Sequence, residues 1–236
     1  FENTETNSAT PDIPGFYGGA SIWVMESDGS SLKLLRHPGR GPNAKHLDHP
    51  SISGDGQYVI YAEFENAETG RRGEARLYKE NLQTQERIVI REQADCAIHH
   101  ATLSLDDKDL TYNRDCGRNR SLVTELGNLE IVVDPVELGG RSGNGMSAGS
   151  KVVYQNEKRS QEQSSRTIAI VLSEFDKQGN RTDRQITDWE YRNRRATISE
   201  NGNFVAWQTN STTGGEKDDI LILDLKELNA MPVRIT

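Results

Sequence analysis

A hairpin pattern that recurs at long intervals constrains the fold of this chain more than any other feature of its sequence. It reads HPSISGDGQYVIYAEF at residues 49 to 64, HATLSLDDKDLTYNRD at 100 to 115 and RATISENGNFVAWQTN at 195 to 210. A degenerate copy, MSAGSKVVYQNE, begins at Met146. Each copy alternates apolar and polar residues on both sides of a turn, and Asp-Gly and Asn-Gly turns tolerate positive φ. Each copy therefore predicts two antiparallel strands.

Two further strand-like runs follow each hairpin. They are ARLYKENL and QERIVI, then SLVTEL and NLEIVV, then RTIAIVLSEF and TDRQIT, and finally DILILDL and PVRIT. Four strands per unit, repeated every ~40–50 residues, are typical of β-propeller blades. Only 33% of the residues are hydrophobic, which fits many short, half-exposed strands better than one thick core. The sequence predicts an all-β propeller of four-stranded antiparallel blades, and a β-sandwich is the alternative.

Another segment, SIWVMESDGSSLKLL at residues 21 to 35, precedes the first full copy and reads as two outer strands joined at Asp28-Gly29. It resembles the TolB-type propeller repeat, whose outer strands read like I-W-V-M-x-x-D-G-S followed by a leucine-containing strand. That family's inner hairpin also resembles P-S-I-S-G-D-G-Q-Y-V-I-Y here, with Gly54 where the family usually has proline. The resemblance covers about residues 21 to 236 and implies a propeller fold, but it implies little about chemistry.

Four full units and one half unit predict five blades, of which the first is incomplete. We therefore divide the chain into residues 1–20, an N-terminal arm or blade-completing strand that reads as a mature or trimmed N-terminus, and residues 21–236, the β-propeller domain. The missing strands come from the arm, from the rest of a longer propeller, or from another molecule. Because a blade short of strands exposes unpaired backbone groups, the open blade edge favours self-assembly or a protein partner.

The two cysteines of the chain fall on the second hairpin. A turn centred on Asp106-Asp107 places Cys96, just before one strand, opposite Cys116, just after its partner. Cross-strand neighbours have Cβ separations that suit a disulfide. A disulfide in turn predicts an extracytoplasmic location, whether periplasmic, at the cell surface or secreted. The alternative is a pair of buried thiols.

Matching repeat positions at the start of the hairpins carry the candidate functional residues. The innermost strand of each blade lines the central channel of a propeller, so matching residues are expected at similar height around one channel mouth. Arginine and partly charged histidine there would bind a carboxylate, sulfate or phosphate, and an aromatic residue could stack on a sugar ring. The degenerate copy offers Gly143 at this position. The predicted ligand-binding residues are His49, His100, Arg195, Arg194 and Tyr191.

Two interpretations of these residues stay open. Some propellers of this repeat type are lyases for uronic-acid oligosaccharides, and resemblance to them would make a histidine or tyrosine the base and an arginine or metal the neutralising group. His49, His100 and Arg195 would then be catalytic. In the other interpretation these side chains cap strand ends and hydrogen-bond neighbouring blades. No motif spacing is diagnostic of catalysis.

Several other classes of function are disfavoured. Neighbouring histidines of an extended strand point to opposite faces, so we predict no metal site at the histidines, and no cofactor. The net charge of −8 disfavours nucleic-acid binding, and no apolar run approaches the ~20 residues of a membrane span. The leading prediction is a non-enzymatic, extracytoplasmic binding or assembly module. A lyase acting on an anionic oligosaccharide is the alternative.

Overall fold

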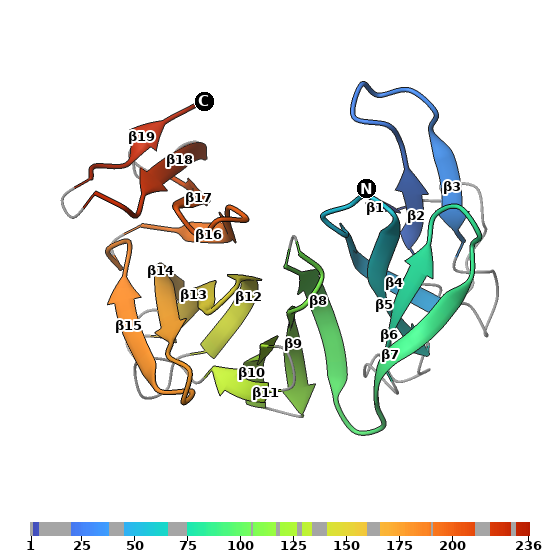
Figure 1. Cartoon of the computed structure of the whole chain (residues 1–236), viewed down its shortest axis with the longest axis horizontal. Coiled ribbons are helices and arrows are strands. Elements are labelled where there is room, and N and C mark those ends of the chain that lie inside the picture. Colours follow the sequence, from blue (N-terminus) through green and yellow to red (C-terminus); the bar gives the residue numbers. More distant parts are fainter. Residues whose placement is uncertain are drawn as a thin grey trace. The chain divides into compact units, whose positions relative to one another are not determined.

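The structure is all-β in the residues that it describes (Figure 1). The computed structural model describes residues 2–4, 20–37, 45–65, 75–104, 106–116, 119–126, 129–133, 141–159, 166–189, 191–210, 218–227 and 230–236. Within these ranges the strands form five antiparallel sheets, numbered here in chain order. No helix among these residues has the length and hydropathy that crossing a membrane requires.

Each sheet is built from consecutive strands. Sheet 1 contains β1 (Glu2–Thr4), β2 (Ala20–Val24) and β3 (Lys33–Arg36). Sheet 2 contains β4 (Lys45–Ile52), β5 (Tyr58–Glu65), β6 (Ala75–Asn81) and β7 (Arg87–Gln93). Sheet 3 contains β8 (Ala97–Leu103), β9 (Leu110–Cys116), β10 (Asn119–Leu126) and β11 (Leu129–Val133). Sheet 4 contains β12 (Arg141–Ala148), β13 (Lys151–Arg159), β14 (Arg166–Phe175) and β15 (Arg181–Gln185). Sheet 5 contains β16 (Asn193–Ile198), β17 (Phe204–Thr209), β18 (Asp219–Asp224) and β19 (Val233–Arg234).

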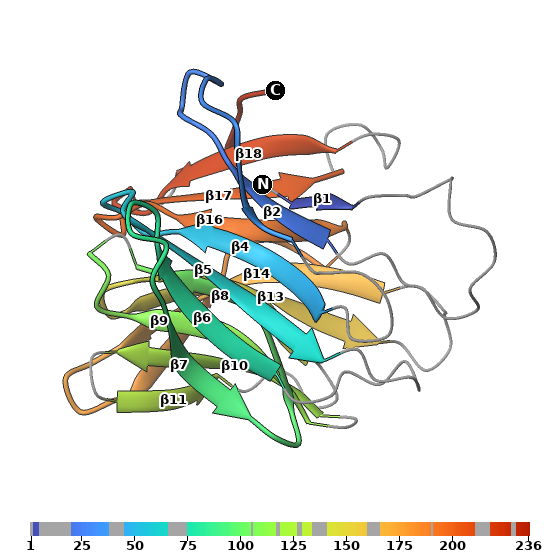
Figure 2. The same cartoon turned by 90° about the vertical axis from the view of Figure 1, so that its right-hand side faces the viewer.

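This organisation confirms the predicted fold. Sheets 2 to 5 each have four strands in chain order, which is the blade of a β-propeller, and sheet 1 has three among the described residues. The chain is thus a five-bladed propeller with an incomplete first blade; Figure 2 shows strands β4 to β7 of one blade lying side by side. In sheet 1, β1 pairs with β2 in the register Glu2↔Ile22 to Thr4↔Ala20. The division into an arm of residues 1–20 and a domain of residues 21–236 stays a prediction, since 5–19 lie outside the described residues.

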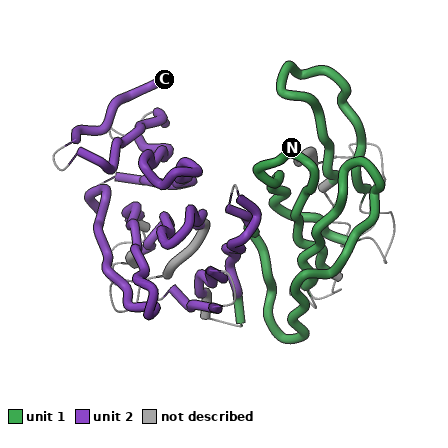
Figure 3. The backbone as a smooth tube through the Cα atoms, in the orientation of Figure 1, with its two compact units in different colours: residues 1–101, 115–117 green, residues 102–114, 118–236 purple. Residues whose placement is uncertain are grey.

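The strands divide into two compact units, which are described separately (Figure 3). Unit 1 comprises residues 1–101 and 115–117, and unit 2 comprises 102–114 and 118–236. In unit 1, Ile22 and Leu35 of sheet 1 pack against Val59, Tyr61 and other apolar residues of sheet 2. In unit 2, one face of sheet 5 packs on sheet 4 in the same manner. Face-to-face burial of apolar residues between successive sheets is therefore the recurring source of stability.

The hairpin turns repeat at the level of single hydrogen bonds. Ser53 Oγ donates to Asp55 Oδ1 (2.7 Å) and accepts from the Tyr58 backbone N–H (2.9 Å). Ser199 makes the equivalent pair of bonds, to Asn201 Oδ1 and from the Phe204 N–H, each at 2.9 Å. Glycines take the positive-φ position of both turns, as their Asp-Gly and Asn-Gly sequences predict.

A β-bulge also repeats, on the innermost strand of the blade. In sheet 2 the register moves from Asp48↔Ala62 to Ser51↔Ile60, so that His49 and Pro50 together lie opposite Tyr61. In sheet 5 the register moves from Arg194↔Gln208 to Thr197↔Ala206, which places Arg195 and Ala196 opposite Trp207. Both aromatic side chains are buried, so the bulge lies against the core of the blade.

Sheet 4 has the same bulge, and it corrects one assignment. Its register moves from Gly143↔Gln155 to Met146↔Val153, so Asn144 and Gly145 lie opposite Tyr154. The residue equivalent to His49 is therefore Asn144, and the assignment of Gly143 was wrong. The cause is the turn, which is two residues long between Ala148 and Lys151 but four residues long between the hydrogen-bonded residues Ser53 and Tyr58, and between Ser199 and Phe204.

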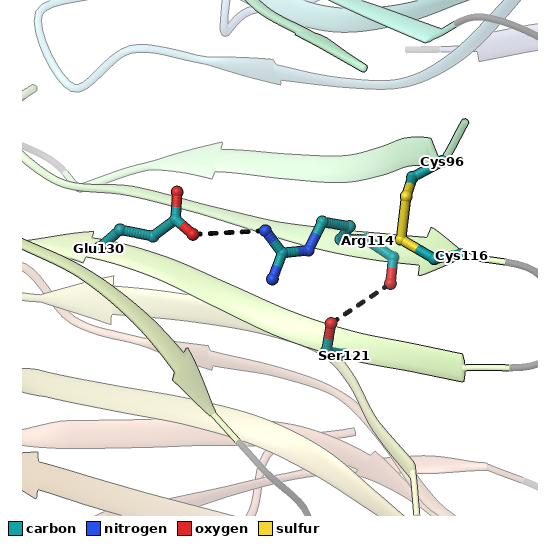
Figure 4. The surroundings of a disulfide bond; sticks show 5 residues. All are labelled: Cys96, Arg114, Cys116, Ser121 and Glu130. Carbon is teal, nitrogen blue, oxygen red and sulfur yellow. Dashed lines mark hydrogen bonds and ion pairs between the residues drawn. A yellow bond between two sulfur atoms is a disulfide. The ribbon is translucent and has the colours of Figure 1, made fainter. Parts of the chain in front are cut away.

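The predicted disulfide is present (Figure 4). Cys96, just before β8, is bonded to Cys116, the last residue of β9, with a Cα–Cα distance of 4.4 Å. Farther along sheet 3, Arg114 of β9 donates a hydrogen bond to Glu130 of β11 (3.3 Å). The disulfide thus closes a hairpin at the end opposite its turn.

A buried carboxylate joins sheets 1 and 2 within unit 1. Glu80 is fully buried, and its Oε2 accepts hydrogen bonds from Arg36 Nε (2.7 Å) and Tyr61 OH (2.9 Å). Burial raises the pKa of Tyr61 to about 12, so the phenol stays a donor at neutral pH. Arg36 lies on β3, and the pair therefore couples the incomplete blade to the next one.

Candidate functional site

Unit 1 brings two predicted site residues, His49 of β4 and His100 of β8, into direct contact. Their ring centroids are 3.2 Å apart, and the rings are tilted by 48°. Both residues have positive φ, 47° and 52°, which non-glycine residues rarely adopt. The left-handed backbone turns each side chain away from the direction that a regular strand would give it.

A third histidine completes the cluster. His99 is buried, and its ring centroid lies 4.8 Å from that of His100 and 6.4 Å from that of His49. The expectation that neighbouring histidines point to opposite faces assumed a regular strand, and the positive φ of His100 breaks that regularity. The side chain of His49 is 40% exposed, whereas His99 is buried.

Two carboxylates accompany the histidines. Asp48 is buried and forms an ion pair with His49 through Oδ1 and Nδ1. Asp115 Oδ2 lies 3.2 Å from His99 Nε2. Burial by itself would raise the pKa of Asp48, but the hydrogen bond with His49 and the positive charge of the nearby histidines bring that pKa below its ordinary value. Asp48 is therefore an anionic partner that holds the His49 ring.

This cluster has the elements of acid–base chemistry. An imidazole oriented by a buried carboxylate can take up or release a proton near neutral pH. Among the described residues, no group of three or more His, Cys, Asp and Glu side chains has the arrangement of a metal site. The cluster consists of imidazoles and carboxylates in contact.

Unit 2 carries the remaining predicted site residues. Arg195 is exposed and has a φ of 54°, and its backbone N–H donates to Gln155 Oε1 (3.0 Å). Arg194 forms an ion pair with Asp218 through Nη2 and Oδ2. The carbonyl of Tyr191 accepts a hydrogen bond from Asn193, the buried amide at the start of β16. Arg195 is therefore the arginine of this group that is most open to an anion.

The repeat pattern predicted some of these residues and missed others. It predicted His49, His100 and Arg195 at one mouth; the first two lie in unit 1 and the third in unit 2, so their convergence stays a prediction. It did not identify Asp48 or Asp115. The signal for Asp48 was its position beside His49 at the start of a repeated hairpin, but only the bulge turns the two side chains together.

Comparison with known proteins shows the fold of this chain. No family model matches the sequence, and no curated protein matches it. The structure is similar to that of an oligogalacturonate lyase from Vibrio parahaemolyticus (12% identity, TM-score 0.56), covering 90% of this chain and 59% of that one. It is also similar to the β-propeller domain of the Trilobed protease from Pyrococcus furiosus, which has an open velcro topology (15% identity, TM-score 0.55), covering 91% and 62%.

A third similarity involves a putative TolB from Agrobacterium tumefaciens, at 12% identity and a TM-score of 0.48, covering 90% of this chain and 87% of that one. That TM-score is too low to support an argument. The chain spans about 60% of the length of the lyase and protease structures that it resembles. The TolB-type repeat thus stays a prediction, and what the comparisons show for this chain is a β-propeller fold.

Proposed function

We propose that this chain is a non-enzymatic, extracytoplasmic module for binding and assembly, joined to its partner through the incomplete first sheet. The observation that carries the proposal is the strand count. Sheet 1 has three strands among the described residues where each other sheet has four. Its strand β1 has three residues, whereas the strands in the equivalent second position of the other sheets, β5, β9, β13 and β17, have six to nine.

Because β1 is short, the edge of sheet 1 favours the addition of a strand from another molecule. The three residues of β1 cover only part of β2, which continues through Trp23 and Val24. A strand from another molecule can lie along β1, and main-chain hydrogen bonds would supply the affinity. The Cys96–Cys116 disulfide supports a periplasmic, surface or secreted location, because such bonds persist in oxidising compartments.

Light scattering and electron microscopy of the intact chain and of an Asn3→Pro variant test this proposal. Proline removes a backbone N–H from β1 and disfavours a strand at that edge, so assembly is expected to disappear. Asn3→Ala, which keeps the backbone donor, is the matched control and is expected to assemble. Deletion of residues 1–20 should reproduce the effect of proline. Equal assembly of all four proteins would contradict a role for this edge.

A lyase is the second candidate, favoured by the contact between His49 and His100 beside the buried Asp48. A histidine would take the proton α to a uronate carboxylate. The bond from the β carbon to the glycosidic oxygen would break, a C=C bond would form, and the leaving oxygen would gain a proton. Neutralisation of the carboxylate would require a cationic group beside the histidines.

Incubation with oligogalacturonate and measurement of the ultraviolet absorbance of an unsaturated product test this candidate. The intact chain is expected to form the product, and His49→Ala and His100→Ala are expected to abolish it. His37→Ala, at an exposed histidine of unit 1 away from the cluster, should retain it. The candidate is contradicted if the intact chain forms no product, or if the His49→Ala and His100→Ala variants form it at the rate of the intact chain.

A further inference from the structure

One face of sheet 5 exposes a stripe of aliphatic side chains. Ile222 of β18 lies directly opposite Val233 of β19, and the Ile235 N–H donates to the Ile220 carbonyl, so these side chains share a face. Ile220 is 40% exposed, Val233 63% and Ile235 57%. Met231, which precedes β19, is 81% exposed. Contiguous exposed apolar residues of this kind mark interaction surfaces.

The strand register identifies the residues of sheet 4 that are equivalent to the exposed residues of sheet 5. Tyr154↔Val171 in sheet 4 corresponds to Trp207↔Leu221 in sheet 5, because both aromatic residues lie opposite the bulge. Ile220 is therefore the equivalent of Ile170. By the same register, Ile222 is the equivalent of Leu172.

In sheet 4 the equivalent residues are covered by the next blade. Ile170 and Leu172 are buried in one cluster with residues of sheet 5, among them Ile198, Val205 and Trp207. The exposed stripe of sheet 5 is thus the face on which a propeller blade receives its successor. A successor must offer the opposite face of a blade, rich in aromatic and aliphatic side chains.

Sheet 1 exposes such a face. The bulge between Ile22 and Trp23 of β2 matches the bulge between Leu77 and Tyr78 of β6, so Trp23 is the equivalent of Tyr78. Tyr78 is one of the residues of sheet 2 that pack on its predecessor, sheet 1. On the same face as Trp23, directly opposite it, lies Leu34, which is 40% exposed.

We propose that sheet 5 of one copy receives sheet 1 of a second copy, so that molecules associate head to tail. The inference rests on the proposed assembly function. It identifies the partner as a second copy of the chain and the second contact surface as the exposed face of sheet 5. Different patches meet in such an interface, which therefore builds rings if the rotation closes and open filaments if it does not.

The proposal is tested with two variants, in each of which one of the two faces is blocked. The double variant Val233→Glu, Ile235→Glu blocks sheet 5, and Leu34→Glu blocks sheet 1. Each buried glutamate is expected to weaken association at least about tenfold, so each variant alone is monomeric in sedimentation velocity. Mixed in equal amounts, they are expected to form a heterodimer and nothing larger. One variant supplies an unblocked sheet 1 and the other an unblocked sheet 5, and the heterodimer buries both of these faces.

Complementation separates blocking from misfolding, since a misfolded variant cannot restore a partner's interface. Leu129→Glu, at a residue of β11 that is 49% exposed outside this face, is the matched control and should assemble like the intact chain. A mixture that stays monomeric overturns the proposal, as does an intact chain that is monomeric at all concentrations. If the sheet 5 variant assembles fully while Asn3→Pro does not, the assembly function stands and this face is not its partner surface.

Discussion

At the scale of residues, six described non-glycine residues have positive φ, and three of them are predicted site residues. His49, His100 and Arg195 occupy the same place in three repeats, and all three have φ between 47° and 54°. A left-handed conformation costs a non-glycine residue about 1–2 kcal/mol, so the surrounding bulge must hold it. Such local strain concentrates at functional positions, which supports a shared role for the three residues.

The strained backbone at Arg195 predicts that a glycine variant is more stable than an alanine variant at this position, the reverse of the usual order within a strand. Arg195→Gly is expected to unfold with a free energy about 1 kcal/mol higher than Arg195→Ala, because only glycine adopts positive φ without steric cost. The control is Thr197, two residues later in the same strand, where alanine should be the more stable replacement by about 0.5–1 kcal/mol. Urea unfolding of the four variants measures both differences. The same order at both positions would show that the backbone at Arg195 is unstrained.

The lowered pKa of Asp48 predicts a pH dependence of stability. Because the folded pKa lies below the unfolded value of about 3.9, the ionised Asp48 stabilises the folded chain above that value. This contribution is lost as the pH falls through the folded pKa. Urea unfolding of the intact chain and of Asp48→Asn should therefore differ most at neutral pH, and the difference should shrink below about pH 4. A difference that stays constant down to about pH 2 would contradict the ion pair with His49.

At the scale of elements, local sequence predicted the strands and hairpins because their signals are local. Short runs of β-branched and aromatic residues identified strands such as β5 and β17, and the Asp-Gly and Asn-Gly pairs identified their turns. The cysteine pair followed from the same symmetry about a turn. The bulges could not be predicted, since a bulge depends on how two strands pair, and His49 and Asp48 meet only because of one. The choice of Gly143 over Asn144 failed for the same reason.

The disulfide should stabilise the chain by closing the loop of sheet 3. With a sequence separation of 20 between the cysteines, its loss in a Cys96→Ala, Cys116→Ala variant is expected to lower the free energy of unfolding by about 3 kcal/mol. Denaturation with and without dithiothreitol checks this. The intact chain should weaken in reductant to the level of the variant, and the variant itself should not respond. A chain equally stable with and without reductant would contradict a structural role for the bond.

At the scale of the whole molecule, sheets 1 and 2 bury apolar faces on each other, as do sheets 3 and 4 and sheets 4 and 5, and among the described residues sheets 1 and 5 each leave large apolar side chains exposed. Sheet 1 is short of a strand among the described residues, and sheet 5 exposes Ile220, Val233 and Ile235. Sequence repeats could count the blades but could not show which faces stay exposed, because exposure depends on what each sheet packs against. The exposed side chains of sheets 1 and 5 form the surfaces through which we propose that copies of the chain assemble.

The most direct test of the assembly function is the molar mass of the intact, oxidised chain, measured by light scattering over a wide range of concentrations. The expected result is a mass that rises with concentration above that of the 26.4 kDa monomer. Two complementary terminal surfaces on one molecule give association of this kind. A mass that stays at the monomer value throughout would contradict the assembly function and leave the histidine cluster as the site to pursue.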